Sequence, residues 1–289
     1  MGAGNKVVGA VILNYNDAPT TKNLVNRIHD YKSIDHIVVV DNCSTDNSVE
    51  ALRELADEKV SLIRTKMNGG YGAGNNEGVK YLVREFKVNV AIIANPDVEF
   101  TDEFAYEISC MISDEVCIAS GIMLDKNNEE DATYTGKTNT YCQDLLDCTA
   151  LIKKIVKTKT ANFSADFVNV EYVPGSLFAI DANAFIQLGG FDENVFLYCE
   201  ERILGNKVLN ARKKIVLNRR ISYKHLHSVS INKSMKLIKQ IKQLYRSRLY
   251  YWKNYKKVNL FNYYILCIVM QYGILLRNLY CKFAEFQSC

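Results

Sequence analysis

Short runs of branched apolar residues alternate with segments of helical periodicity over the first hundred residues. Runs of this length without a polar face are typical of strands that are buried on both sides of a sheet. We expect four such strands, at Val7–Leu13, His36–Val40, Val60–Arg64 and Ala91–Ala94. Helices are expected between them, at Thr20–Tyr31, at Ser48–Leu55 and up to about Phe86. The alternation predicts an α/β fold with a mainly parallel, doubly wound central sheet and flanking helices.

Polar, turn-forming residues follow each expected strand. They are Asn14-Tyr15-Asn16, Asp41–Asp46, Asn68–Gly78 and Asn95-Pro96-Asp97. Pro96 has no N–H for a sheet ladder, so the fourth strand should end there and leave Asp97 at its carboxyl end. Open α/β sheets bind ligands at the edge where the carboxyl ends of parallel strands meet. The pattern therefore predicts a ligand site around Asp97, although a single Asp here would also suit a simple turn.

The segment Asn68–Gly78 is rich in glycine. It follows the third strand rather than the first, and its spacing differs from the dinucleotide fingerprint G-x-G-x-x-G, which argues against a Rossmann dehydrogenase. Two interpretations remain. The segment is either a plain glycine-rich turn or a backbone that approaches a nucleotide closely at a helix N-terminus. We expect the helix itself to begin after the segment.

An acidic pair stands in the second half of the chain. A strand is expected at Tyr172–Ile180 and a helix at Ala182–Leu188. A Gly-Gly-Phe-Asp-Glu turn then leads through Phe-Leu-Tyr to Glu200 and Glu201. Without this context the pair would suit the acidic first turn of a helix, where the helix dipole stabilises negative charge.

Two further features flank this part of the chain. The stretch 125–167 is expected to form a variable loop over the site, with a short helix at Leu145–Val156. His225 and His227 alternate, so both imidazoles should lie on one face of a strand. A lone histidine is usually structural, and the pattern does not decide which of the two is functional.

Charge is distributed unevenly along the chain. From Arg202 onward there are 19 Lys and Arg against one acid, whereas the first 201 residues hold 17 basic and 31 acidic residues. A basic arm on an acidic body predicts a polyanionic partner surface, either a membrane or nucleic acid. Met235–Trp252 reads as a basic amphipathic helix. The apolar run Tyr263–Leu276 is shorter than the roughly 20 residues of a membrane span, so an interfacial or core helix is expected.

The cysteines and the first sixteen residues indicate the cellular compartment of the protein. The nine cysteines form no C-x-x-C pair, which argues against a disulfide framework or a zinc ribbon and indicates a reducing environment. The first sixteen residues have too short an apolar part and too little positive charge for a signal peptide. A cytoplasmic protein, peripheral on the inner face of the membrane, is expected.

In this order, the motifs NYN, DNCSTD, NGGYGAGNNEG, NPD and GGFDE–FLY with its acidic pair resemble those of the inverting family 2 glycosyltransferases. The resemblance is greatest to the branch that includes bacterial rhamnosyltransferases. It implies the GT-A fold, with a nucleotide-binding half over residues 1–100, an acceptor-binding half over 101–230, and C-terminal helices over 231–289.

The resemblance also implies residue roles. Glu201 corresponds to the catalytic base. Asp97 would hold Mg²⁺ or Mn²⁺ on the donor diphosphate, with His225 or His227 closing over the diphosphate or the metal. The residues implied in binding the nucleoside-diphosphate sugar are Asn14, Tyr15, Asn16, Asp41, Asn68, Gly70, Asn76 and Asn95.

Three positions depart from the family pattern. Glu201 replaces the usual Asp, Ile203 stands where another Asp is usual, and Lys207 stands where Arg is usual. The expected reaction is transfer of a sugar, rhamnose or a hexose, to a hydroxyl of a lipid-linked or surface glycan. The alternative is a nucleotide-sugar-binding protein without catalysis.

The C-terminal helices are expected to bind an anionic membrane surface or to form a homodimer interface. Nucleic acid is not expected as a partner, because the apolar run 263–276 does not suit a phosphate groove.

Overall fold

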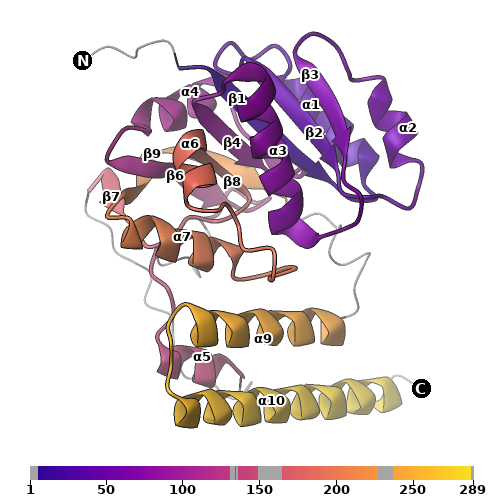
Figure 1. Cartoon of the computed structure of the whole chain (residues 1–289). Coiled ribbons are helices and arrows are strands. Elements are labelled where there is room, and N and C mark those ends of the chain that lie inside the picture. The colour runs from indigo at the N-terminus through magenta and orange to yellow at the C-terminus, as the bar shows by residue number, and fades with distance from the viewer. Residues whose placement is uncertain (1–5, 131–133, 135, 149–164, 227–236, 288–289) are drawn as a thin grey trace.

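The computed structural model of the chain describes residues 6–130, 134, 136–148, 165–226 and 237–287. A single nine-stranded sheet forms its centre (Figure 1). The strands are β1 (Val8–Asn14), β2 (His36–Asp41), β3 (Val60–Arg64), β4 (Val90–Ala94), β5 (Val98–Glu99), β6 (Val116–Leu124), β7 (Phe167–Asn169), β8 (Leu177–Asp181) and β9 (Lys214–His225). The helices of the described ranges are α1 (Ala18–Ile28), α2 (Ser48–Arg53), α3 (Gly70–Phe86), α4 (Asp102–Met111), α5 (Tyr141–Cys148), α6 (Ala182–Gln187), α7 (Glu200–Asn210), α9 (Leu237–Asn254) and α10 (Leu260–Gln287).

The sheet has a parallel half and a mixed half. Its order is β3-β2-β1-β4-β8-β6-β9-β5, with β7 paired to β9. The strands β3, β2, β1 and β4 are mutually parallel, as the sequence predicts. Beyond them β8 runs antiparallel to both β4 and β6, while β6 and β9 are parallel. The predicted α/β fold with a central sheet and flanking helices is therefore confirmed, while the sheet as a whole is mixed rather than mainly parallel because β8 runs antiparallel to both its neighbours.

Alternation along β1 shows why the sheet is covered on both faces. Ile12 packs in one apolar cluster with Leu24 of α1. Val11, one position earlier, packs in the opposite cluster with Val79 and Leu82 of α3. Successive side chains of a strand point to opposite faces, so a strand without polar positions needs a layer of helices on each side.

The prediction that the helix after β3 begins beyond the glycine-rich segment is wrong. Helix α3 begins at Gly70, inside that segment. A Cβ atom at Gly74 would collide with Leu13, and one at Gly78 would collide with Val11. The glycines at these two positions let α3 approach β1 closely, so their role here is helix-on-sheet packing.

The C-terminal helices form a second layer with α5 below the sheet (Figure 1). The buried stripe of α9 contains Tyr245, Tyr251 and Trp252, which share an apolar cluster with Ile203 of α7 and Leu266 of α10. The described part of the predicted amphipathic stripe, which lies in α9, therefore packs on protein. Helix α5 ends at Cys148, and the rest of the helix predicted at 145–156 lies outside the described residues.

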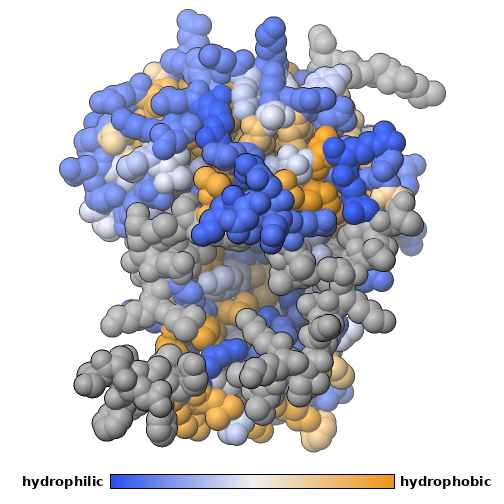
Figure 2. All heavy atoms as spheres, turned by 180° about the vertical axis from the view of Figure 1, so that it is seen from behind, coloured by the Kyte–Doolittle hydropathy of each residue, from blue (hydrophilic) through white to orange (hydrophobic). Residues whose placement is uncertain are grey.

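Helix α10 is apolar on its outer side as well. Figure 2 shows hydrophobic side chains gathered over this part of the molecule. Six apolar side chains of the helix are each more than half exposed: Leu260, Phe261, Tyr264, Ile268, Tyr272 and Leu275. The window Leu260–Leu279 is long and apolar enough to cross a membrane, which corrects the expectation that this run is too short. Length and composition of one helix are weak evidence for a span.

Candidate active site

The carboxyl ends of β1 and β2 lie side by side, as the sequence predicts, and hydrogen bonds join them. Asn14 Nδ2 donates to Asp41 Oδ1 at 2.9 Å, and the Ser44 backbone N–H donates to Asp41 Oδ2 at 3.0 Å. Asn14 and Asp41 are both fully buried. The following turn residue, Asn16, has φ 54° and accepts from the Thr45 backbone N–H at 2.8 Å. These contacts fix the two loops relative to each other.

The third strand end is tied to the second. Asn42 Nδ2 donates to Asn68 Oδ1 and to the Gly70 carbonyl, both at 3.0 Å. Gly70 has φ +89°, and a Cβ atom there would collide with the Phe196 carbonyl. Only glycine fits this position, because the backbone is left-handed and another loop touches it.

Asn76 belongs to α3 and contacts a different loop. Its side-chain amide donates to the Phe191 carbonyl at 3.0 Å and to Glu193 Oε1 at 2.9 Å, and its Oδ1 accepts from the Phe191 N–H at 2.8 Å. Its side chain therefore holds the Gly-Gly-Phe-Asp-Glu turn. Tyr15 stands half-buried between Asn14 and the exposed Asn16.

Asp97 and His225 meet at the edge of the sheet. His225 Nε2 lies 3.2 Å from Asp97 Oδ1, and pairing of β5 with β9 brings the two together. Both side chains are mostly buried, 11% exposed for Asp97 and 15% for His225. His227 lies outside the described residues. Asn95, two residues before Asp97, donates its backbone N–H to the Ser176 carbonyl at 2.7 Å.

A carboxylate beside an imidazole fits a divalent cation that is shared with a phosphate ligand. Among the described residues there is no group of three or more His, Cys, Asp or Glu arranged for a metal. A Mg²⁺ or Mn²⁺ ion held here would therefore need phosphate oxygens and water to complete its shell, as is usual for ions bound with nucleotides.

The acidic pair opens α7 at a strained turn. Tyr198 and Cys199 have φ 71° and 69°, a conformation that non-glycine residues rarely adopt. Such strain clusters at functional sites. Glu200, which follows this turn, is only 3% exposed. Within the described structure, Glu200 Oε1 has no hydrogen-bond partner. Burial, together with the neighbouring Glu201, raises the pKa of Glu200 well above its usual range.

Glu201 packs against Gly175. A Cβ atom at Gly175 would lie 2.5 Å from Glu201 Oε1, so this glycine makes room for the carboxyl group. Burial raises the pKa of Glu201, while a backbone hydrogen bond at Gly175 and the Arg202 guanidinium work against the rise. A carboxylate with a raised pKa is a stronger proton acceptor than an exposed one.

One pocket of about 370 Å³ brings these groups together. Its lining includes Asn95 and His225 from the sheet edge, the pair Glu200 and Glu201, and residues of α9. The complete lining is Tyr71, Asn95, Met123, Tyr172, Pro174, Gly175, Ser176, Leu197, Tyr198, Cys199, Glu200, Glu201, Arg202, His225, Leu244 and Arg248. The sequence did not predict the contribution of Leu244 and Arg248, since nothing in the pattern of α9 says which face meets the pocket.

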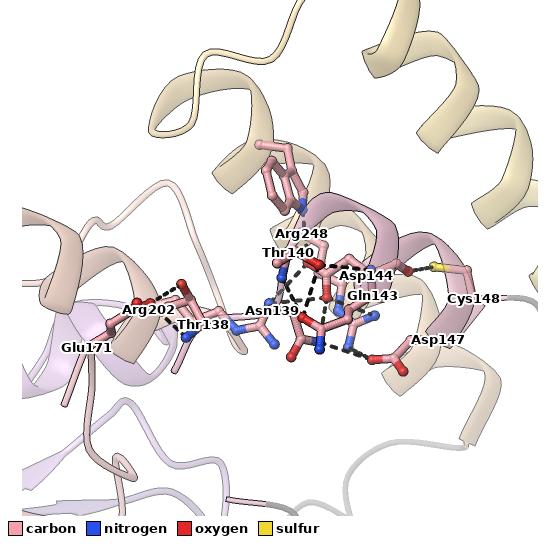
Figure 3. Close-up of polar contacts among 11 residues, drawn as sticks. Thr138, Asn139, Thr140, Gln143, Asp144, Asp147, Cys148, Glu171, Arg202 and Arg248 are labelled. Atoms are coloured by element: carbon pink, nitrogen blue, oxygen red, sulfur yellow. Dashed lines mark hydrogen bonds and ion pairs between the residues drawn. The ribbon is translucent and has the colours of Figure 1, made fainter. Parts of the chain in front are cut away.

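A buried carboxylate links the pocket wall to the C-terminal helices (Figure 3). Asp144 of α5 is fully buried, and Arg202 Nη1 lies 3.1 Å from its Oδ2. Arg248 Nη1 of α9 lies 3.7 Å from Asp144 Oδ1, and Trp252 Nε1 donates to Oδ2 at 2.8 Å. We call Asp144, Arg202, Arg248 and Trp252 the Asp144 cluster. It connects the residue after Glu201 to α9.

A second link runs through the Gly-Gly-Phe-Asp-Glu turn. Asp192 Oδ2 accepts hydrogen bonds from Tyr250 at 2.9 Å and from Tyr255 at 2.6 Å. Asp192 thus holds the C-terminal end of α9 against the body.

Solved structures with a similar fold define the fold class. GalNAc-T7 with UDP, GalNAc and Mn²⁺ matches 88% of this chain and 50% of its own length, with a TM-score of 0.62 and 16% identity. The mannosyltransferase PcManGT from Pyrobaculum calidifontis, in complex with GDP-Man and Mn²⁺, matches 99% of this chain and 82% of its own, with a TM-score of 0.61 and 12% identity. The fold is that of the GT-A glycosyltransferases, as predicted.

The family model "Glycosyl transferase family 2" matches residues 10–189. The chain therefore belongs to glycosyl transferase family 2, which confirms the resemblance seen in the motifs. A curated relative, the low-salt glycan biosynthesis hexosyltransferase Agl10 of Haloferax volcanii, is 27% identical over 199 residues. That match covers 66% of this chain and 58% of the relative, so the chain spans less than two thirds of its length.

Proposed function

We propose that the chain transfers a sugar from a nucleoside-diphosphate sugar to a hydroxyl of a glycan acceptor, with inversion at the anomeric carbon. One observation carries the proposal: His225, which contacts Asp97, lines the same pocket as the buried pair Glu200 and Glu201. The proposed site for a metal-bound diphosphate and the proposed proton acceptor would thus adjoin one cavity. The hexosyltransferase relative favours a hexose over rhamnose as the transferred sugar.

The donor would lie across the strand ends. Asn14, Tyr15, Asn16 and Asp41 would hold the nucleoside, with Asn68, Gly70 and Asn95 beside it and Asn76 supporting the adjoining turn. Asp97 and His225 would hold Mg²⁺ or Mn²⁺, which neutralises the charge that develops on the leaving diphosphate. Both solved structures carry a nucleotide with Mn²⁺, which supports this arrangement.

Glu201 would act as the base of a single displacement. The acceptor hydroxyl oxygen attacks the anomeric carbon and forms the new glycosidic bond. The bond from that carbon to the diphosphate oxygen breaks, the nucleoside diphosphate leaves, and the hydroxyl proton passes to the Glu201 carboxylate. Attack from the face opposite the leaving group inverts the configuration.

Three parts of the chain would have different roles. Residues 1–100 would bind the donor, 101–230 the acceptor, and 231–289 would attach the protein to the inner face of a membrane. The exposed apolar side of α10 and the exposed Lys253, Lys256 and Lys257 beside it support peripheral attachment. A lipid-linked or surface glycan is then the expected acceptor.

Removal of the Asp97 carboxylate tests the donor site. Asp97→Ala should abolish the Mn²⁺-dependent part of UDP or GDP binding in calorimetry, because the ion loses its protein carboxylate. Asp114→Ala, an exposed acid of the α4–β6 loop, is the control and should bind as the wild type does. Unchanged metal dependence in Asp97→Ala would refute the donor site.

The alternative, a nucleotide-sugar-binding protein without catalysis, predicts binding with no turnover. Incubation of the wild type with a panel of nucleotide sugars and Mn²⁺ distinguishes the two, since a transferase hydrolyses its donor slowly even without an acceptor. Absence of any nucleoside diphosphate release would favour the alternative.

A further inference from the structure

The part of the pocket wall that α9 supplies is unusual in its charge. Arg248 is 8% exposed, and Arg202 across from it has a side chain that is 15% exposed. Both line the pocket beside the acidic pair. Guanidinium groups are seldom buried unless they are fully paired.

Arg248 is less completely paired than Arg202, whose guanidinium also lies near Glu201. Asp144, the one fully buried carboxylate of the Asp144 cluster, is shared between them. Asp147, the second partner of Arg248, lies 3.3 Å from it and is 52% exposed, so solvent screens this pair. Arg248 Nε is buried and, within the described ranges, has no hydrogen-bond partner. An unmade hydrogen bond on a buried charge is costly unless a ligand completes it.

Among the described residues, the neighbouring carboxyl groups leave Arg248 Nε without a partner. Glu200 Oε1 is another buried pocket atom without a hydrogen-bond partner among the described residues, and burial beside Glu201 favours the neutral form of this carboxyl group. Glu201 is the proposed base and faces Gly175. A ligand that suits this wall has an anionic oxygen for the arginines and a hydroxyl for the acidic pair.

We propose that the pocket receives an acceptor that carries a phosphate next to its sugar, with the phosphate bound by Arg248 and Arg202 and the sugar hydroxyl presented to Glu201. The inference rests on the proposed function and specifies its acceptor. A volume of about 370 Å³ is within the range of small-ligand sites. Planar guanidinium groups match phosphate oxygens in geometry as well as in charge. Helix α9 is accordingly part of the acceptor site.

A water-soluble probe separates this site from the membrane. Glucose 1-phosphate and methyl glucoside differ in the phosphate, and neither has an alkyl chain that could bind to α10. Calorimetry on the full chain is done with saturating UDP and Mn²⁺, and in parallel GDP and Mn²⁺, so that the donor site is filled. We expect glucose 1-phosphate to bind at least tenfold more tightly than methyl glucoside.

Arg248→Gln should weaken glucose 1-phosphate binding about tenfold to a hundredfold, the usual range for one charge-assisted hydrogen-bond pair. The matched control is Arg246→Gln, an exposed arginine on the same helix, which should bind as the wild type does. Because Arg248→Gln disturbs the Asp144 cluster and could unfold, Leu244→Glu is a second variant. It places a carboxylate on the same wall and should also weaken glucose 1-phosphate but not methyl glucoside.

Several results would overturn the inference. The first two are equal affinity for glucose 1-phosphate and methyl glucoside, and loss of glucose 1-phosphate binding when the nucleotide is added. The other two concern the variants: an equal loss of glucose 1-phosphate affinity in Arg246→Gln and Arg248→Gln, or an unchanged affinity in Leu244→Glu. Nucleotide binding is measured in a separate titration of the same protein. A protein that binds UDP or GDP with Mn²⁺ but not glucose 1-phosphate keeps the proposed function and loses the phosphate subsite, whereas failure to bind either nucleotide refutes the proposed function itself.

Discussion

Glu200 and Glu201 are adjacent in sequence but differ in surroundings. Glu200 is sealed from solvent with an unsatisfied oxygen, whereas Glu201 is held against Gly175 and close enough to Arg202 for its charge to be stabilised. Two neighbouring carboxyl groups whose environments differ in this way take different protonation states. Glu201 is therefore the better candidate for the base, and Glu200 for a neutral hydrogen-bonding group.

Glu201→Gln tests this assignment. The amide keeps the size of the side chain but cannot accept a proton, so transfer should fall by about two to four orders of magnitude. Nucleotide affinity should change little, because the pair is not in the proposed donor contacts. Initial rates and calorimetry measure the two effects. If Glu200→Gln lost activity and Glu201→Gln kept it, the roles would be exchanged.

The raised pKa of Glu200 predicts that the free energy of unfolding depends on pH, and Glu200→Gln tests this prediction. The folded protein holds the Glu200 proton to a higher pH than the unfolded chain does, so this group lowers the free energy of unfolding as the pH rises from the ordinary glutamate pKa of about 4.5 towards its raised pKa. The glutamine variant lacks this loss. Urea denaturation should show the variant gaining stability relative to the wild type between pH 5 and pH 8.

The exposed Glu58→Gln is the control for that comparison and should give a difference that does not vary with pH. A constant difference for Glu200→Gln as well would mean that Glu200 is ionised in the folded protein.

Among the elements, α5, α7 and α9 depend on one carboxylate. Asp144→Asn would leave Arg202 and Arg248 facing each other without a shared anion. Removing one partner of a buried pair is strongly destabilising, by about 3 to 5 kcal/mol. Trp252 is the single tryptophan of the chain and donates to Asp144, so its fluorescence reports unfolding of this layer directly.

Asp147→Asn is the matched comparison on the same helix. Its carboxylate is half exposed, so its loss should cost no more than about 1 kcal/mol. Similar, small effects of both substitutions would show that Asp144 does not hold the layer together.

Some of the helices and strands could be predicted from the sequence pattern and others could not. The four parallel strands and their polar ends were predictable, since strand burial on two faces leaves a continuous apolar run and each turn needs polar residues. The start of α3 at Gly70 was not, because glycines that serve close packing on β1 look like turn residues in sequence.

The pocket wall from α9 could not be predicted for a related reason. The stripe of Tyr245 and Trp252 is amphipathic whether it meets lipid or protein, and only the tertiary structure shows that it meets α5 and α7. Conversely, Asp97 and His225, which are 128 positions apart in sequence, were both singled out from motifs, and the pairing of β5 with β9 brings them to 3.2 Å.

For the whole molecule, the exposed side of α10 predicts membrane attachment. The protein should co-sediment with anionic phosphatidylserine-containing vesicles at low salt and less at high salt, because each lysine near the surface contributes about 1 kcal/mol and is screened. Phe261→Ser with Ile268→Ser should reduce binding at least tenfold, as two exposed apolar side chains no longer enter the interface.

Tyr106→Ser removes an exposed aromatic side chain from α4 on the body and should leave vesicle binding unchanged. Binding that ignores the α10 substitutions would assign this face to another occupant, such as a second copy of the chain.

The family match ends at residue 189, yet the pocket continues into α7 and α9. The proposed nucleotide contacts precede that boundary, whereas Glu201, His225 and the α9 wall of the pocket follow it, and Asp144 joins the two stretches through its ion pair with Arg202. Exchange of helices α9 and α10 alone would leave the proposed nucleotide contacts, Asp97, His225 and Glu201 in place and change one wall of the pocket. The proposed enzyme would then accept a different acceptor while its donor site stayed the same.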